Sequence, residues 1–332
     1  MYKSNYKRRH KSKSRTLKSV FDEWFEQVLC PSLALSTVKR YEQELRLRLF
    51  RAPMMPRQID EIKAIQITGF YNTLHLEGSS INSIRIIHNL LSGFFSYCIK
   101  AEILTKNPMN AVQFPKFKNT VTTPPKKSCL TGQEVQKIVK HAESCQETFI
   151  FVFAIFTGLR QGEILALTYN DIKDWQISVN KTMYALTHEG RKQIICTSAK
   201  THKSVRDVPF LKNLMSMYEA HVALEKEKHR ECGIDFSKNS IVFSSSTCGY
   251  SCGRNLRRKL SKLLNYLEIE PTNFHGLRHT FCTNLAKNGV GLKTASLLMG
   301  HANPNITMNV YTHVQEDEMT QGIASLSNLF VT

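Results

Sequence analysis

Histidine, arginine and tyrosine side chains gather near the C-terminal end of this 332-residue chain. The segment 273–280 reads Asn-Phe-His-Gly-Leu-Arg-His-Thr, and two short segments follow it: Leu-Met-Gly-His, which ends at residue 301, and Val-Tyr-Thr-His, which ends at residue 313. Guanidinium and imidazole groups hydrogen-bond phosphate oxygens, and a tyrosine oxygen is a nucleophile. The set therefore predicts a site that holds a phosphodiester while a tyrosine oxygen attacks it.

His275 and Arg278 are three residues apart, in a helix that we expect to start at Pro271 and Thr272. This spacing places both side chains on one helix face, where an imidazole and a guanidinium repel each other unless an anion lies between them. A phosphate group would be such an anion. The alternative for an isolated pair of this kind is a structural role.

A helix is expected from Leu292 to Met299, and Gly300 is expected to end it directly before His301. A turn at residues 303–304 then leads to a further helix that carries Tyr311. A tyrosine between apolar residues is most often part of a core, with its hydroxyl satisfied at the surface.

A second arginine lies in the segment Thr-Gly-Leu-Arg-Gln-Gly-Glu, residues 157–163. An apolar helix is expected to end at the glycine, and a new helix opens with Arg160. Glu163 lies three residues further on and can hold the guanidinium in place. The alternative is a surface ion pair, which would contribute only about a few tenths of a kcal/mol.

The chain is strongly basic, with 45 Lys and Arg against 27 Asp and Glu and a net charge of +18. Such a balance favours phosphate contacts, so nucleic acid is the expected partner; the alternative is a basic chain that is merely soluble. No apolar run is long enough to span a membrane, and no apolar segment follows the basic N-terminus as it would in a secretory signal. We expect a cytoplasmic protein.

The nine cysteines lack the CxxC pairs of a zinc site and the dense spacing of a disulfide scaffold, so we expect reduced thiols. Cys248 and Cys252 are four residues apart, but no second pair faces them. The sequence therefore predicts no metal site and no cofactor.

The composition predicts four segments. Residues 1–15 form a basic flexible tail that orders on DNA or is simply a solvated end. Residues 16–112 form a helical bundle, and the proline- and lysine-rich residues 113–127 form an extended linker. Residues 128–332 form a second, mostly α domain with one β interruption.

About four helices are expected in the first domain. Apolar residues recur at intervals of three and four from Leu17 to Val28, which predicts a helix that Pro31 ends. Ser36 is expected to cap the second helix. The remaining two helices are expected over 64–76 and 80–101.

In the second domain, Thr131 and Glu134 have the spacing of a capping box at the start of a helix. Three short runs of alternating or β-branched residues follow and predict a small three-stranded antiparallel sheet. These runs are residues 175–179, 192–196 and 205–209. Helices are expected again from Leu211 to the C-terminus.

Together these motifs resemble those of the tyrosine recombinase (phage integrase) family. The matching residues occur in the family's order and approximate spacing, with a lysine between the second and third strands and an acidic neighbour of the first arginine. They are Arg160, Glu163, Lys200, His275, Arg278, His301 and Tyr311. The resemblance covers residues 128–332, and the helical segment 16–112 resembles the family's SAM-like core-binding domain in organisation only.

The resemblance implies a mechanism. Arg160 and Arg278 would clamp the non-bridging oxygens of the scissile phosphate, and His301 would donate a third hydrogen bond to it. Tyr311 would attack phosphorus and form a 3′-phosphotyrosine, so that neither ATP nor a metal is required. His275 would assist proton transfer or stabilise the transition state, and Lys200 would protonate the leaving 5′-oxygen.

The resemblance also implies that two DNA duplexes recombine within a homotetramer, with an accessory excision or DNA-bending factor as a further partner. Basic residues outside the site are candidates for duplex contacts, and a solvated face is the alternative. They are Lys39, Arg40, Arg254, Arg257, Arg258, Lys259 and Lys262.

Within the family, the motifs around Arg160 and Tyr311 favour an integrase of a phage or conjugative element. Such integrases often carry an arm-binding domain ahead of the core-binding one, and segment 1–15 is too short for it; either the protein acts on short sites, as chromosome-dimer resolving recombinases do, or the sequence begins inside a longer relative. Further alternatives are a type IB topoisomerase, a catalytically silent DNA-binding regulator and a plain helical structural protein.

Overall fold

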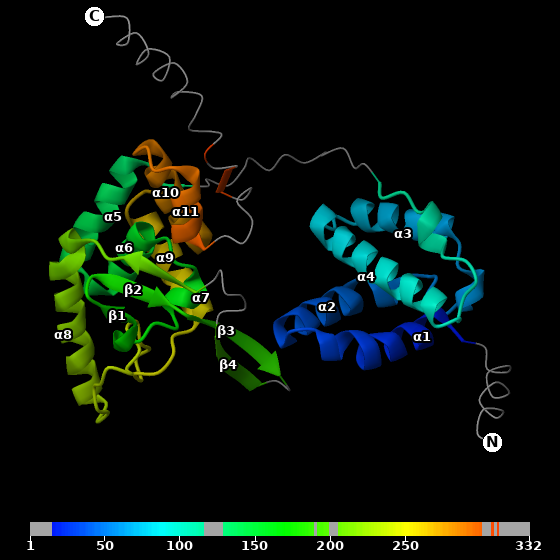
Figure 1. Cartoon of the computed structure of the whole chain (residues 1–332), viewed down its shortest axis with the longest axis horizontal. Helices are drawn as coiled ribbons and strands as arrows, with labels where there is room; N and C mark the ends of the chain where they lie inside the picture. Colours follow the sequence, from blue (N-terminus) through cyan, green and yellow to red (C-terminus); the bar gives the residue numbers. More distant parts are fainter. Residues whose placement is uncertain are drawn as a thin grey trace, which may run out of the picture. The chain divides into compact units, whose positions relative to one another are not determined.

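The computed structural model describes residues 15–115, 129–188, 191–198 and 205–300, together with Thr307, Met308 and Tyr311. The chain divides into two compact units, Met1–Thr122 and Thr123–Thr332, which are described separately. Both are mostly helical, and the second also contains small antiparallel sheets (Figure 1). Among the described residues, no helix is long and apolar enough to cross a membrane.

Four α-helices, joined by short helical turns, form the described part of the first unit (Figure 1). They are α1 (Leu17–Trp24), α2 (Leu35–Leu47), α3 (Ala64–Leu76) and α4 (Ile81–Lys100). Aromatic rings fill the space between the first and last of them: the ring of Phe21 lies 5.4 Å from that of Trp24 and 5.0 Å from that of Phe94. All four helices predicted for this segment are therefore present.

The predicted cap of α2 was wrong. The extended residue is Ala34, whose carbonyl accepts the amide of Val38 at 3.1 Å, so the helix already begins at Leu35 and Ser36 lies in its first turn. After α1 the chain continues through a π-helical turn and a 3₁₀ turn that contains Pro31. A short extended stretch follows this turn and ends at Ala34, so α2 starts before the expected serine.

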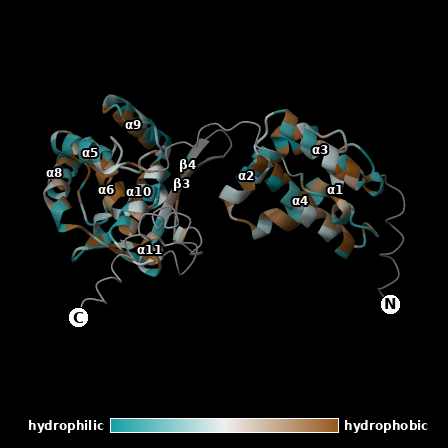
Figure 2. Ribbon diagram, turned by 90° about the horizontal axis from the view of Figure 1, so that it is seen from above, coloured by the Kyte–Doolittle hydropathy of each residue, from teal (hydrophilic) through white to brown (hydrophobic). Residues whose placement is uncertain are grey.

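Seven α-helices are described in the second unit. They are α5 (Gly132–Ser144), α6 (Phe149–Thr157), α7 (Gln161–Ile164), α8 (Met215–Glu231), α9 (Gly253–Tyr266), α10 (Phe274–Lys287) and α11 (Leu292–Met299). Helix α6 is apolar on every side up to its last residue, Thr157, and is buried apart from Phe156, as expected of a helix that other elements surround (Figure 2). The predicted capping box of α5 is present, because the Glu134 carboxylate accepts the amide of Thr131 at 2.8 Å.

The β-structure differs from the prediction. A three-stranded antiparallel sheet is present, but its strands are β1 (Ile172–Lys173), β2 (Gln176–Val179) and β5 (Arg206–Pro209). Trp175 lies in the turn before β2, where Asp174 and Trp175 have positive φ angles of 48° and 63°. Two positive φ angles are typical of the tight turn that joins two hairpin strands.

The run 192–196 was wrongly placed in this sheet. It belongs to β4 (Arg191–Ser198), which pairs along its whole length with β3 (Lys181–His188) in a separate two-stranded sheet. Strand β3 was not predicted, because its lysine, alanine and histidine interrupt the β-branched and aromatic residues that mark a strand. Because β3 was not predicted, the run 192–196 was paired with the two other predicted runs, 175–179 and 205–209.

Candidate active site

The turn between α6 and α7 positions Arg160. Helix α6 ends at Gly158, which has a φ of +63° and lies so close to Phe281 that a Cβ atom would come within 2.2 Å of its ring. No larger residue fits there. Arg160 is then the N-cap of α7, and its amide donates to Glu163 Oε2 at 2.8 Å while its Nη1 donates to Oε1 at 2.7 Å. The Glu163 side chain is only 6% exposed, so the pair is not a surface ion pair.

Arg206 is a second partner of Glu163 that the sequence analysis missed. Its Nη2 donates to Glu163 Oε2 at 2.9 Å and its Nη1 to Oε1 at 3.2 Å. Burial by itself raises the pKa of Glu163, but the hydrogen bonds and positive charges of Arg206 and Arg160 outweigh it and hold the pKa below 4.5. The signal in the sequence was the period of two: Arg206 lies on the same strand face as the buried Val208.

The C-terminal end of α11 joins three arginines through three consecutive carbonyls. The carbonyl of Leu298 accepts Arg206 Nε at 2.7 Å, that of Met299 accepts Arg278 Nη2, and that of Gly300 accepts Arg160 Nη2 at 2.8 Å. The negative end of the helix dipole favours cations at this place. As predicted, Gly300 ends the helix, with a φ of +60°.

Arg278 lies at the centre of this arrangement and is 1% exposed. Its Nη1 donates to the carbonyl of Gly158 at 2.5 Å, and its buried Nε has no partner among the described residues. Burial and then the charge of Arg160 lower the pKa of Arg278 to about 9, which leaves the guanidinium charged at neutral pH. The helix that carries it begins later than predicted, because the Asn273 side chain, and not Pro271 or Thr272, caps α10 by accepting the amide of Gly276.

His275 is an exposed residue in the first turn of α10, and its ring packs edge-on against the half-buried His279 with 4.4 Å between centroids. Partial burial, and then His279, Arg278 and Arg160, lower the pKa of His275. Burial and Arg278 likewise lower that of His279. Neutral imidazoles at neutral pH are able to accept a proton, as an acid–base role requires.

Tyr311 is helical, as predicted, and buried. Its ring belongs to a small apolar cluster with Cys282, Ala286 and Met299, and its hydroxyl donates to the carbonyl of Val290 at 2.7 Å. Val290 follows the C-terminal end of α10, whereas His275 and Arg278 lie in the first turns of that helix. The described contacts therefore join Arg160, Glu163, Arg206 and Arg278 around α11, and hold the Tyr311 hydroxyl at a backbone carbonyl.

Lys200 and His301 lie outside the described residues. Lys200 falls in the chain between β4 and β5, and His301 directly follows Gly300. We expected this lysine between the second and third strands of one sheet. The flanking strands, β4 and β5, instead belong to two different sheets.

The candidate DNA contacts fall on exposed helix faces. On α9, leucines form the buried face and the neighbouring exposed stripe holds Arg254, Arg257 and Arg258. Lys262 is exposed as well, whereas Lys259 forms an ion pair with Glu147 at 2.8 Å.

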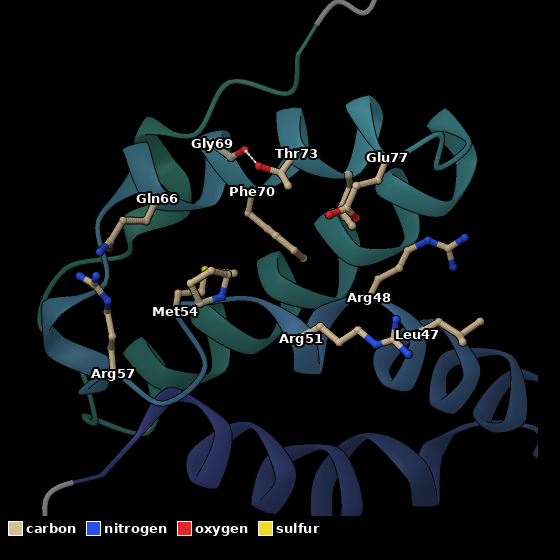
Figure 3. A pocket seen from close by; sticks show the side chains of 12 residues that line it. Leu47, Arg48, Arg51, Met54, Arg57, Gln66, Gly69, Phe70, Thr73 and Glu77 are labelled. Carbon is tan, nitrogen blue, oxygen red and sulfur yellow. Dashed lines mark hydrogen bonds between the residues drawn. The ribbon is translucent and has the colours of Figure 1, made fainter.

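In the first unit, Lys39 is paired with Glu42 at 2.8 Å, and Arg40 is exposed. A cavity of about 590 Å³ lies between the C-terminal end of α2 and α3, and residues of both helices line it (Figure 3). Its lining combines apolar side chains with exposed basic ones, Arg51 and Arg57. These two guanidinium groups point in different directions, so they do not converge on one ligand (Figure 3).

Comparison with known proteins agrees with the fold and with the family resemblance. A family model described as the phage integrase family matches residues 128–318. The chain is 30% identical over 333 residues to the Tyrosine recombinase XerC-like of Caldanaerobacter subterraneus subsp. tengcongensis, covering 95% of this chain and 84% of that protein. It is 27% identical to the ICEBs1 integrase of Bacillus subtilis, covering 82% and 72%. The solved Tn1549 transposon integrase, in complex with transposon right end DNA, has a similar fold, with a TM-score of 0.77 at 21% identity over 94% of this chain and 100% of that chain.

Proposed function

We propose that this chain, which belongs to the phage integrase family of tyrosine recombinases, is a site-specific DNA recombinase that acts through a 3′-phosphotyrosine intermediate. The observation that carries the proposal is the convergence of Arg160 and Arg278 on the end of α11. Two guanidinium groups held by carbonyls and one carboxylate leave a net positive charge for a phosphate.

In the proposed reaction, the Tyr311 oxygen forms a bond to phosphorus and the bond from phosphorus to the 5′-oxygen breaks. The tyrosine proton passes to a base, for which His275 is the candidate, and the departing 5′-oxygen takes a proton from Lys200. Arg160, Arg278 and His301 bind the non-bridging oxygens. One phosphodiester replaces another, so no ATP is needed, and the 5′-hydroxyl of a second strand reverses the step.

Tyr311 must leave Val290 to take part in this reaction. The hydrogen bond to the Val290 carbonyl contributes about 1 kcal/mol, and the ring must also leave its apolar cluster with Cys282, Ala286 and Met299, so DNA binding has to offset both costs. The structure is therefore consistent with a resting state in which the arginines are gathered first and the tyrosine is delivered when DNA binds.

The proposed substrate is double-stranded DNA that carries the attachment sites of a phage or conjugative element, with a homotetramer as the working assembly and an accessory excision or DNA-bending factor as a further partner. The ICEBs1 integrase and the transposase from transposon Tn916, which are both similar to this chain, support this choice. We assign residues 16–112 to core-site DNA binding, 113–127 to a linker after the 1–15 tail, and 128–332 to catalysis. The cytoplasm is the proposed location.

A second candidate is recombination that resolves chromosome dimers. It is favoured by the similar protein that is named for a XerC-like recombinase. The two functions differ in their DNA: an element integrase recombines the ends of the element that carries its gene, whereas a dimer-resolving enzyme recombines two copies of one chromosomal site. Recombination assays on both kinds of site distinguish them.

A suicide substrate tests the chemistry. DNA from the flanks of the gene is nicked next to the cleavage position, so that the short 5′-hydroxyl fragment diffuses away and the covalent adduct accumulates. Wild type is expected to give a protease-sensitive adduct on a denaturing gel, and Tyr311→Phe none. Tyr266→Phe is the control, because Tyr266 is 73% exposed at the end of α9. DNA binding without an adduct in any variant would support a silent regulator instead.

A further inference from the structure

We propose that Arg206 is a positioning residue for this reaction: it neutralises Glu163 and holds the end of α11, so that Arg160 remains available to the phosphate. The proposal rests on the function proposed above. None of the motifs that identify the family in this chain includes Arg206, and its contacts alone point to the role.

Glu163 is surrounded by donors from both arginines. Its Oε1 accepts Arg160 Nη1 at 2.7 Å and Arg206 Nη1 at 3.2 Å, and its Oε2 accepts the Arg160 amide at 2.8 Å and Arg206 Nη2 at 2.9 Å. Arg206 therefore binds both carboxylate oxygens through its two terminal nitrogens, the bidentate geometry in which arginine binds carboxylates most strongly.

The two arginines differ in exposure. The Arg206 side chain is 7% exposed and that of Arg160 is 40% exposed. The buried carboxylate thus has a buried cation as its permanent partner, while the Arg160 guanidinium keeps an exposed part. Without Arg206, Glu163 and Arg160 would neutralise each other; with it, the three groups carry one net positive charge towards the substrate.

Arg206 also fixes the backbone on which the other two arginines depend. Its Nε donates to the carbonyl of Leu298, next in the chain to the acceptors of Arg278 and Arg160. A Cβ atom on Gly300 would come within 2.8 Å of Arg206 Nη1, so the side chain packs directly on the residue before His301. One side chain from β5 therefore links α7 to the end of α11.

The test compares Arg206→Gln, Glu163→Gln and the double variant on the suicide substrate. We expect Arg206→Gln to slow single-turnover cleavage about 100-fold, the scale on which small misplacements act, with DNA affinity nearly unchanged. Adding Glu163→Gln removes the carboxylate that captures Arg160, so the double variant is expected to cleave about tenfold faster than Arg206→Gln. Arg230→Gln is the control for the loss of one charge, because the Arg230 side chain is 78% exposed on α8.

The outcomes separate the possible failures. No adduct with wild type would overturn the proposed function itself. Wild-type cleavage by Arg206→Gln, or a double variant no faster than Arg206→Gln, would overturn the positioning role alone. If Arg206→Gln does not fold, Arg206→Lys provides the test. A lysine keeps the positive charge but cannot reach both Glu163 and Leu298, so we expect cleavage about tenfold slower than wild type. Cleavage at the wild-type rate would contradict the proposal.

Discussion

Two glutamates of this chain occupy the same position of a capping box and yet have different environments. Glu134 caps α5 at the half-buried edge of the second unit, and Glu163 caps α7 between two arginines. Capping by itself contributes about 1 kcal/mol in either place. The difference between them is the buried ion pair, in which removal of one partner leaves the other charge uncompensated.

We therefore expect Glu163→Gln to lower the free energy of unfolding by about 3–5 kcal/mol at pH 7. Glu134→Gln, the matched change, is expected to cost about 1 kcal/mol or less. Chemical denaturation of the three proteins measures both values. Equal losses for the two variants would mean that the ion pairs of Glu163 with Arg206 and Arg160 add nothing to the free energy of unfolding.

The stability difference between wild type and Glu163→Gln should also depend on pH. The pKa of Glu163 lies below 4.5 in the folded chain, since burial raises it less than Arg206 and Arg160 lower it. The stabilisation by its charge is therefore complete above pH 4.5 and is lost as the pH falls through the lowered folded value. The difference in melting temperature between wild type and Glu163→Gln should shrink below pH 4.5; a difference that stays constant would contradict the charge-based explanation.

The imidazole of His275 gives a prediction for catalysis. Its pKa is lowered by partial burial and then by His279, Arg278 and Arg160. A base must be neutral, so the cleavage rate should fall as the pH drops below this pKa. In His279→Gln the fall should begin at a higher pH, because one of the lowering influences is gone. Titration of the His275 ring by NMR checks the same shift, and an unchanged pKa in the variant would contradict it.

At the level of elements, the end of α11 is the structure on which the site depends. The carbonyls of its last two residues and of its C-cap Gly300 accept hydrogen bonds from three arginines, which lie at the N-cap of α7, in α10 and in β5, far apart in the chain. The left-handed Gly300 ends the helix there and keeps room for Arg206. A change at this one glycine should therefore affect the site without touching any of its charged groups.

Gly300→Ala tests this dependence. The variant must place a Cβ at a φ of +60° and within 2.8 Å of Arg206, so we expect a loss of about 1–2 kcal/mol in stability and clearly slower cleavage. Gly289→Ala is the matched control: its φ is +70°, but nothing lies within 4 Å of the added atom. It should lose stability by a similar backbone strain and cleave at the wild-type rate. Equal cleavage by the two variants would argue against contact with Arg206.

The sequence predicted the elements that depend on local signals, and it did not predict contacts between distant segments. Helices were located because apolar periodicity and the glycines at 158 and 300 are local signals, and Arg160 was placed correctly for the same reason. The pairing of β4 with β3 depends on a non-local partner that the residue pattern did not reveal. Arg206 was missed because its role comes from α7 and α11, neither of which is near it in sequence.

At the scale of the whole molecule, the net charge of +18 is the property that DNA binding should use. Basic residues of the second unit have two different environments. The Arg206 and Arg278 side chains are buried and donate hydrogen bonds to backbone carbonyls, and Arg206 also to Glu163, whereas the arginines of α9 are exposed. Exposed cations displace the counterions of DNA, so most of the charge that sets affinity should reside on residues other than the buried arginines of the candidate site.

This separation can be measured from the salt dependence of DNA binding. Each phosphate contact contributes about 0.9 to the slope of log affinity against log salt concentration. Arg254→Gln, Arg257→Gln and Arg258→Gln, which change one exposed stripe of α9, should together lower the magnitude of the slope by about 2–3, while bound DNA is still cleaved at the wild-type rate. Lys259→Gln is the control on the same helix, because Lys259 is already paired with Glu147 at 2.8 Å, and it should change the slope little. A slope that is unchanged in the triple variant would show that this face of α9 is solvated, and the DNA contact would then have to be sought on other exposed cations such as Arg40.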